Sequence, residues 1–367
     1  MFQRHLAVFA IFALLSAAVC AQNTDRFASL DTNGDGKITQ DEFPGGPGLF
    51  AQLDKNKDGF IDKDEAKALA AKKESKRAAK DRGPLPEDIE TQSDIVYKAV
   101  GGQKLALDLY RVKGKTYEKA PLIIFIHGGG YVGGNKQGAV KRAPDLFLPL
   151  MREHGYLVAS LDYRLCAAKG PKLVDCSTDC KDAVRFLVKN SAAYGIDPAR
   201  IATMGTSAGG SLAMIQPLTQ DADLPGDPDL AKVPVAVKCA VSWFGCTDFT
   251  KMEGFREQKV QDRGPVLFKG SAEADKHERE IVSPVYYMLQ AKGKTPVLLV
   301  HGDSDQTVPQ PQSIWMNDEA KRIGFPIEFV NVKNAGHGFQ DTGKGPISPS
   351  MQDIYKLTLD FILKNNK

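Results

Sequence analysis

The chain has 367 residues, of which 42% are hydrophobic and 25% are charged, and its formal net charge at pH 7 is +3. This length accommodates a targeting signal, a small module and one larger domain. The small net charge and the lack of a nucleic-acid-binding motif argue against a nucleic-acid partner, and no segment has the length and apolar character of a transmembrane helix.

Residues 1–21 have the pattern of a secretory signal peptide. Arg4 and His5 supply a basic start, residues 6–19 are apolar, and Val19-Cys20-Ala21 form a cleavage site. The apolar run is too short to span a bilayer as a helix. We therefore expect a secreted or periplasmic protein with a cleaved signal. A lipoprotein acylated at the cysteine is the alternative, which the valine before it disfavours.

Two twelve-residue stretches, 31–42 and 54–65, follow the calcium-loop pattern of an EF hand. In each, oxygen-bearing side chains stand at the first, third and fifth places, glycine at the sixth, an apolar residue at the eighth and glutamate at the twelfth. A main-chain carbonyl at the seventh place completes the set. The expected Ca²⁺ ligands are Asp31, Asn33, Asp35, Lys37, Glu42, Asp54, Asn56, Asp58, Phe60 and Glu65. We expect a small helical module of paired EF hands over residues 22–70, in which calcium is structural because it is abundant outside cells.

Residues 71–92 are expected to form a basic helix followed by a linker. Alanine, lysine and arginine dominate the chain up to residue 82, and Gly83-Pro84-Leu85-Pro86 ends the helix. The basic run could contact an acidic polysaccharide or a membrane surface. A solvated helical spacer is the favoured interpretation.

From residue 93 to 367, buried strand patterns alternate with helix patterns. This alternation predicts an α/β domain with a mostly parallel sheet and helices on both faces. The expected strands include 121–126, 156–161, 238–244, 296–300 and 327–332, and the expected helices include 182–189 and 352–363.

A reactive serine is indicated by Gly205-Thr206-Ser207-Ala208-Gly209, which lies between a short apolar run and the start of a helix. A G-x-S-x-G set in this position is the nucleophile elbow of serine hydrolases, a turn so tight that glycines must flank it. Upstream, strand 121–126 ends in His127-Gly128-Gly129-Gly130. Glycines after a strand let main-chain N–H groups approach the oxyanion that forms when an ester is attacked.

Three histidines follow Ser207, and their positions distinguish them. In the elbow-bearing fold the order along the chain is serine, acid, histidine. His301 precedes the candidate acids, and His277 lies in a charged run expected to be a solvated helix face. His337, in a glycine-containing loop after strand 327–332, is therefore the expected general base.

The acid is expected in the loop that follows strand 296–300, where a carboxylate can hold the histidine ring in the required tautomer. This loop contains Asp303 and Asp305. Asp305 is favoured because it lies deeper in the loop. Asp303 stays open as an alternative and would otherwise cap the loop.

From about residue 93 to its end, the chain resembles the α/β-hydrolase esterase/lipase family that includes bacterial acetyl-xylan and feruloyl esterases. The matching motifs are HGGGYVGG at 127–134, LDYRL at 161–165, YGIDPARI at 194–201, GTSAGG at 205–210, WFGCTDF at 243–249, HGDSDQTVP at 301–309 and NAGHGF at 334–339. The resemblance implies the nucleophile Ser207, the acid Asp305 and the base His337. It also implies oxyanion donors at the N–H of Ala208 and of Gly129 or Gly130. One departure is Cys246, where relatives usually carry proline.

Five cysteines remain after the expected cleavage, namely Cys166, Cys176, Cys180, Cys239 and Cys246. An exported chain can oxidise cysteines, but an odd number leaves at least one unpaired. Cys166 with Cys176 is the candidate disulfide. Cys180 is expected to be a buried thiol on a helix.

These features predict an exported serine carboxylic-ester hydrolase that works through an acyl-enzyme and needs no cofactor for catalysis. The resemblance implies acetyl or feruloyl esters of polysaccharides as substrates. One alternative is a serine peptidase of the prolyl-oligopeptidase type, although the chain before residue 93 is too short for the propeller such enzymes carry. Another is an inactive, calcium-dependent binding or attachment protein, which an intact serine, acid and histidine argue against.

Overall fold

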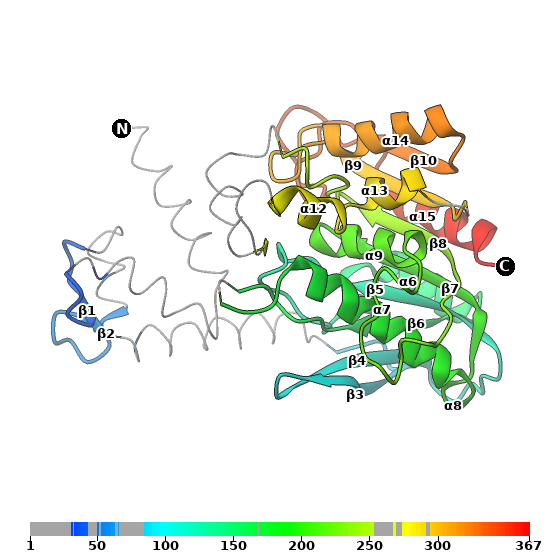
Figure 1. The fold of residues 1–367 in the computed structure, drawn as a ribbon, viewed down its shortest axis with the longest axis horizontal. Helices are drawn as coiled ribbons and strands as arrows, with labels where there is room; N and C mark the ends of the chain where they lie inside the picture. The colour runs from blue at the N-terminus through cyan, green and yellow to red at the C-terminus, as the bar shows by residue number, and fades with distance from the viewer. Residues whose placement is uncertain are drawn as a thin grey trace. The chain divides into compact units, whose positions relative to one another are not determined.

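The structure is a computed structural model that describes residues 31, 33–42, 50, 53–62, 65, 84–167, 169–252, 267–268, 274–290 and 294–367. The chain divides into two compact units, Met1–Gly83 and Pro84–Lys367. The expected signal peptide, residues 1–21, and the expected basic helix up to residue 83 lie outside the described residues. Figure 1 shows the described helices and strands of both units.

The first unit contains a two-stranded antiparallel ribbon. Strand β1 (Lys37–Ile38) pairs with β2 (Ile61–Asp62), and Ile38 lies opposite Ile61. These isoleucines occupy the eighth place of the two expected calcium loops, and both are buried, as are Phe50 and Leu53. The ribbon therefore joins the two loops through their eighth residues.

The second unit is built on an eight-stranded sheet with the order β10-β9-β8-β7-β5-β6-β4-β3. The six strands from β10 to β6 are parallel, whereas β4 is antiparallel to both of its neighbours. The strands are β3 (Ile89–Val100), β4 (Gln103–Val112), β5 (Ala120–Ile126), β6 (Leu157–Leu161), β7 (Ile196–Thr206), β8 (Val237–Trp243), β9 (Val297–Gly302) and β10 (Ile327–Val332). Strand β3 begins at Ile89, inside the range expected to be a linker, because its pairing with β4 extends to Val112.

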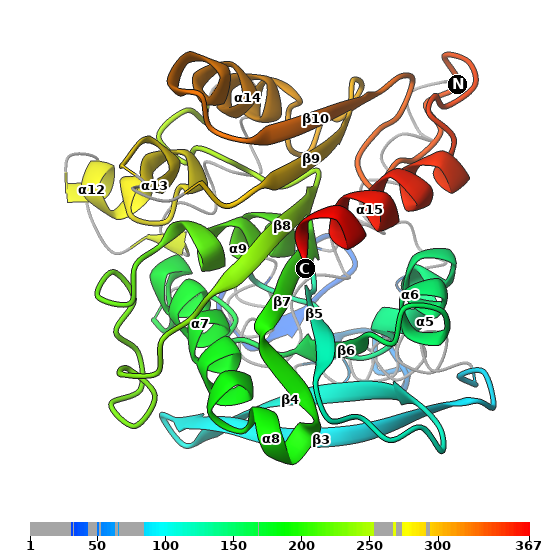
Figure 2. The same ribbon diagram turned by 90° about the vertical axis from the view of Figure 1, so that its right-hand side faces the viewer.

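Helices cover both faces of this sheet (Figure 2). One face packs against α5 (Ala139–Arg142), α6 (Pro144–Arg152) and α15 (Met351–Asn365). The other packs against α7 (Leu173–Lys189), α9 (Ala208–Leu218), α13 (Pro284–Gln290) and α14 (Pro311–Ile323). The remaining described helices are α8 (Ser191–Tyr194) and α12 (Ala274–Glu280). The predicted α/β fold with a mostly parallel sheet is confirmed.

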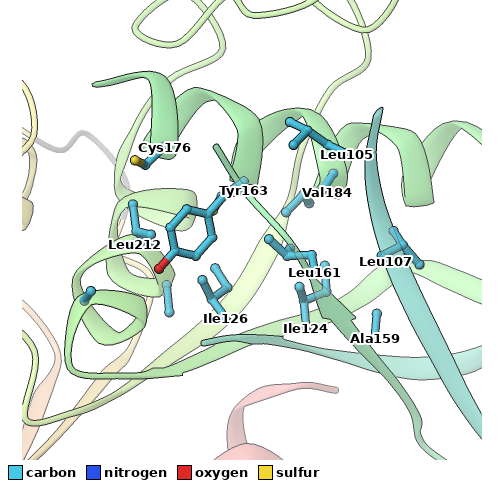
Figure 3. Close-up of a cluster of buried hydrophobic side chains, with 14 of the residues drawn as sticks. Leu105, Leu107, Ile124, Ile126, Ala159, Leu161, Tyr163, Cys176, Val184 and Leu212 are labelled. Carbon is cyan, nitrogen blue, oxygen red and sulfur yellow. The ribbon is translucent and has the colours of Figure 1, made fainter. Parts of the chain in front are cut away.

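Strand β5 illustrates why the central strands are continuous apolar runs. Its alternate side chains Leu122, Ile124 and Ile126 belong to the core under α7 and α9, part of which Figure 3 shows. Ile123 and Phe125 belong to the opposite core under α6 and α15. Because both faces are covered, neither set of alternate positions can be polar.

The arrangement of the strands decides where a site can form. Strands β5, β7, β9 and β10 are parallel, so their carboxyl ends lie at one edge of the sheet. The segments 127–131, 207–209, 303–309 and 333–339 follow these four ends and contain the residues singled out from the sequence. Ligand sites of open α/β sheets form at this edge. No helix in the described part of the chain has the length and apolar character needed to cross a membrane.

Candidate active site

Ser207 occupies a strained turn between β7 and α9. Its backbone has φ 54° and ψ −122°, a conformation that is uncommon for a residue with a Cβ atom and that is found at functional sites. A Cβ atom on Gly205 would collide with the carbonyl of Gly209, and one on Gly209 would collide with the carbonyl of Ile126. The two glycines are thus required because the start of α9 lies directly against the ends of β7 and β5.

Three of the predicted side chains form a chain of hydrogen bonds. The Nε2 atom of His337 lies 3.0 Å from Oγ of Ser207, and its Nδ1 atom lies 2.8 Å from Oδ2 of Asp305. A carboxylate only accepts hydrogen bonds, so the histidine Nδ1 carries a proton and its Nε2 lone pair faces the serine hydroxyl. This is the arrangement in which an imidazole takes a proton from a serine.

Asp305 is ionised at neutral pH because of its hydrogen bonds. Burial of the carboxyl opposes ionisation, but bonds from His301 and His337 outweigh burial and hold the pKa of Asp305 well below its ordinary value. The main-chain N–H groups of Thr307 and Val308 also donate to its Oδ1 atom, at 2.8 and 3.0 Å. The carboxylate is therefore fixed in place on both of its oxygen atoms.

Asp303, the alternative acid, has a different role. Its Oδ1 atom accepts hydrogen bonds from the main-chain N–H of Asn334 at 2.8 Å and from the hydroxyl of Ser304 at 3.1 Å. It therefore ties the loop after β9 to the loop that carries His337, and Asp305 is the carboxylate that contacts the imidazole.

His301 has a contact that the order of residues along the chain could not reveal. It is fully buried at the end of β9, and its Nε2 atom lies 2.8 Å from the carbonyl of Val308 and 3.3 Å from Oδ2 of Asp305. On the other side of the ring, Nδ1 lies 2.7 Å from the hydroxyl of Ser313. Nε2 must carry a proton because a carbonyl only accepts, so this ring braces the Asp305 carboxylate and its loop.

We expect His301→Ala to lower kcat by roughly 10²-fold with little change in KM, because a small displacement of Asp305 misaligns His337. His301→Asn, which retains a donor, should restore part of the rate. Steady-state kinetics on p-nitrophenyl acetate measure both. His277, which is exposed on α12, provides the control variant His277→Ala. An unchanged kcat in folded His301→Ala would contradict a positioning role.

The glycine loop after β5 lies against the serine. A Cβ atom on Gly128 would be 2.7 Å from the carbonyl oxygen of Thr206 and 3.2 Å from Cβ of Ser207. Gly129 and Gly130 follow with φ values of 131° and 61°, which only glycine adopts readily. Among the described residues, the main-chain N–H groups of Gly129, Gly130 and Ala208 have no hydrogen-bond acceptor. Ala208 is also the first residue of α9, where the positive end of the helix dipole favours an anion.

His127 is the first residue of this loop, and its side chain is buried. Its ring is stacked on Tyr163 with 4.4 Å between centroids, and burial lowers its pKa to about 4, so it is neutral at physiological pH. The Tyr163 hydroxyl donates to the carbonyl of His127 at 3.0 Å. We therefore infer a structural role for this histidine.

The segment that follows β8 contacts both the site and helix α14. Phe244, with φ 44°, packs edge-on against the His337 ring at 4.9 Å between centroids. Cys246, the departure from the usual proline, is buried, and its thiol donates to Oε1 of Gln312 at 3.3 Å. The same amide oxygen accepts from the main-chain N–H groups of Thr247 and Asp248 at 3.0 and 2.8 Å, so it holds the segment after β8 to α14.

The two expected calcium loops are folded around their own carboxylates. Asp31 accepts hydrogen bonds from the N–H groups of Asp35 and Gly36, and Asp54 accepts the equivalent pair in the second loop. The twelfth-place glutamates Glu42 and Glu65 reach back to the main chain at the third place, at 3.3 and 3.1 Å. The remaining expected ligands, also described, are Asn33, Lys37, Asn56, Asp58 and Phe60.

The chemistry of these loops suits Ca²⁺, which prefers carboxylate, amide and carbonyl oxygens. The sixth-place residues Gly36 and Gly59 have φ values of 83° and 88°, as the sharp turn of such a loop requires. Among the described residues, no three side chains of histidine, cysteine, aspartate or glutamate are gathered into a metal site. Calcium binding therefore rests on the loop pattern and its donor set.

Two family models match parts of this chain. A family model described as BD-FAE matches residues 107–319, a range that contains Ser207 and Asp305 and stops before His337. A second model, described as EF hand, matches residues 24–43 and 48–69.

Similar proteins include Esterase LipQ of Mycobacterium tuberculosis, 27% identical over 264 residues, an alignment that covers 70% of this chain and 59% of LipQ. The chain thus spans less than two thirds of that relative's length. Among solved structures, an esterase of Thermogutta terrifontis aligns with a TM-score of 0.59 and 25% identity, covering 76% of this chain and 92% of the esterase. A truncated carbohydrate esterase from gut microbiota aligns with a TM-score of 0.61 and 22% identity. The alignment covers 77% of this chain and 99% of that esterase, and it shows that the two share a fold.

Proposed function

The chain belongs to the BD-FAE family of α/β-hydrolase esterases, and from this premise we propose that it hydrolyses carboxylic esters through an acyl-enzyme formed on Ser207. The observation that supports this best is the continuous contact from Asp305 through His337 to the serine hydroxyl, at 2.8 and 3.0 Å.

In the first half of the reaction, His337 takes the proton of Ser207 as the serine oxygen attacks the ester carbonyl. The imidazolium that results is stabilised by the Asp305 carboxylate. The N–H groups of Ala208 and of Gly129 or Gly130 would donate to the oxyanion. His337 then gives its proton to the departing alcohol.

In the second half, water replaces the alcohol. His337 removes a proton from the water, which attacks the acyl-serine ester, and the same N–H groups bind the second oxyanion. Collapse of this intermediate releases the acid and returns the proton to Ser207. The chain's own side chains supply every proton transfer in this cycle.

We propose acetyl or feruloyl esters of polysaccharides as the substrates. The motifs shared with acetyl-xylan and feruloyl esterases support this, and the carbohydrate esterase among the structural neighbours is consistent with it. A panel of acetylated and feruloylated xylo-oligosaccharides, p-nitrophenyl esters and dipeptide anilides tests the choice. We expect the highest kcat/KM on an acylated oligosaccharide and no turnover of anilides. Preferred cleavage of the anilides would instead favour the peptidase alternative.

We propose that the first unit binds Ca²⁺ at its two EF-hand loops as a structural ion. The ion would be bound by oxygen atoms of the ten expected ligand residues named above. The free energy of binding would add to the stability of a unit with a small core. We expect calcium to raise the melting temperature of this unit. The variants Glu42→Gln and Glu65→Gln should each weaken binding in calorimetric titrations.

Esterase activity on p-nitrophenyl acetate is the internal control in these experiments. Because the ion takes no part in the chemistry, excess chelator should leave kcat unchanged at temperatures below unfolding. Loss of kcat on chelation, reversed by calcium, would contradict a purely structural role.

We also propose that the chain is exported and loses residues 1–21. The basic start, apolar run and small-residue cleavage site support this. N-terminal sequencing of the mature protein should begin at Gln22, and retention of Met1 would contradict export.

A further inference from the structure

Two cysteine sulfurs lie in contact near the start of α7. The Sγ atoms of Cys166 and Cys176 are 3.4 Å apart, and both residues are buried thiols in this structure. A disulfide bond is about 2.05 Å long, so closure requires the sulfurs to approach by only roughly 1.4 Å. The remaining cysteines have other surroundings, since Cys246 donates to Gln312, Cys239 lies in β8 and Cys180 lies one helical turn beyond Cys176.

The segment that carries Cys166 connects helix α7 to the glycine loop. The main-chain N–H of Cys166 donates to the carbonyl of Tyr131 at 2.8 Å, and Tyr131 directly follows Gly130. On the other side, the Arg164 guanidinium bonds to Asp179 of α7 at 2.7 Å. Any bond that fixes this segment to α7 therefore also fixes one end of the glycine loop, which lies against Ser207.

Cys176 already holds the same segment weakly. It lies near the start of α7, and its thiol donates to the carbonyl of Arg164 at 3.0 Å. Figure 3 shows Cys176 on this helix beside Tyr163 and Leu212, at one end of the core. The hydrogen bond and the sulfur contact join the same two pieces of backbone, so a covalent bond would replace an existing contact rather than create a new arrangement.

We propose that Cys166 and Cys176 form a disulfide when the chain meets an oxidising disulfide compound, and that this bond fastens the support of the glycine loop to α7. One cysteine thiolate attacks a sulfur of the oxidant, whose S–S bond breaks and releases one thiol. The second thiolate then attacks the cysteine sulfur of the mixed disulfide and expels the second thiol. The two cysteines lose two electrons in total, the oxidant gains them, and the two cysteine protons end on the released thiols.

Burial affects the rate of this reaction. It raises the pKa of the Cys176 thiol, and the adjacent Cys166 raises it further, so few thiolates exist in the folded protein at neutral pH. Closure should therefore be slow in the folded state and faster at higher pH or while the chain folds. The oxidising compartment depends on the proposed export, whereas the reaction itself does not depend on the esterase activity.

Peptide mapping of the full chain tests the proposal. The protein is incubated with oxidised glutathione or with dithiothreitol, alkylated under denaturing conditions and digested. We expect a linked species containing both residues, lighter by two hydrogen atoms, after oxidation only. Alkylation of both sulfurs after prolonged oxidation at high pH, or linkage to Cys180 instead, would overturn the assignment.

Stability supplies a second readout that does not depend on digestion. Oxidised wild-type protein should melt several degrees above the reduced protein, because a cross-link restricts the unfolded chain. This difference should vanish in Cys176→Ala and persist in the matched variant Cys239→Ala, since Cys239 is equally buried and lies in β8. A difference that persists in Cys176→Ala would reject the pair. If that variant fails to fold, the mapping of the wild-type chain decides alone.

Discussion

Replacing Ser207 with alanine is expected to lower kcat for p-nitrophenyl acetate by about 10⁶-fold, the size of effect seen when a triad loses its nucleophile. The variant keeps a Cβ atom, so the backbone at φ 54° is no more strained than before and the fold should persist. Without the hydroxyl, His337 has no proton to accept and no acyl-enzyme can form. Stopped-flow and steady-state assays measure the rate of ester hydrolysis, and mass spectrometry shows whether residue 207 is acylated.

The control for this variant is Ser191→Ala, a serine at the start of α8 outside the site. It should retain the native rate. Calcium affinity of Ser207→Ala should also be unchanged, which separates an esterase from a binding protein whose hydrolase unit is inert. Native turnover by folded Ser207→Ala would end the assignment of the nucleophile.

Replacing Asp305 with asparagine is expected to lower kcat by about 10⁴-fold, or roughly 5 kcal/mol of barrier. An amide nitrogen facing Nδ1 of His337 would favour the other tautomer, with the proton on Nε2, and that tautomer cannot accept the serine proton. Asparagine also loses the negative charge that stabilises the imidazolium. Stability should fall as well, because the amide offers a poorer acceptor to the N–H groups of Thr307 and Val308.

Asp303→Asn is the matched control, since it makes the same chemical change two residues away. It keeps an oxygen that can accept from the N–H of Asn334, so we expect less than a tenfold loss. Equal losses in the two variants would contradict the assignment of Asp305 as the acid.

The pH profile gives an independent check on Asp305. Its folded-state pKa lies below the ordinary value, so the carboxylate stays charged as the pH falls toward 4. Protonation of Asp305 should therefore not set the acidic limb of kcat/KM. A limb that follows the titration of an ordinary carboxyl would show that Asp305 is not held in its ionised form.

Motif order predicted the side chains that meet at the site because the fold leaves little freedom there. Each segment follows the carboxyl end of a parallel strand, so Ser207, Asp305 and His337 reach the same edge although 130 residues separate the first from the last. Glycine patterns carried most of this information, since Gly205 and Gly209 stand where main-chain atoms pass too closely for any side chain.

The sequence excludes His301 as the base but does not predict its role in positioning Asp305. Excluding it as the base was reasonable, yet its contact with Asp305 depends on how the loop from 303 to 309 returns over the end of β9. A buried imidazole at a strand end gives no signal in the sequence that distinguishes packing from support of a catalytic group. The sequence likewise carries no sign that Asp303 joins the loop after β9 to the loop that carries His337, because this contact also forms between two separate loops.

The sequence by itself determined the alternating strands and helices, the calcium-loop pattern and the identity of the reactive groups, because these depend on local periodicity and on glycine positions. Only the tertiary structure decided which carboxylate meets His337, which histidine braces it and which cysteines touch. Those contacts arise between loops from different strands, and their geometry depends on packing across the whole sheet rather than on any one segment.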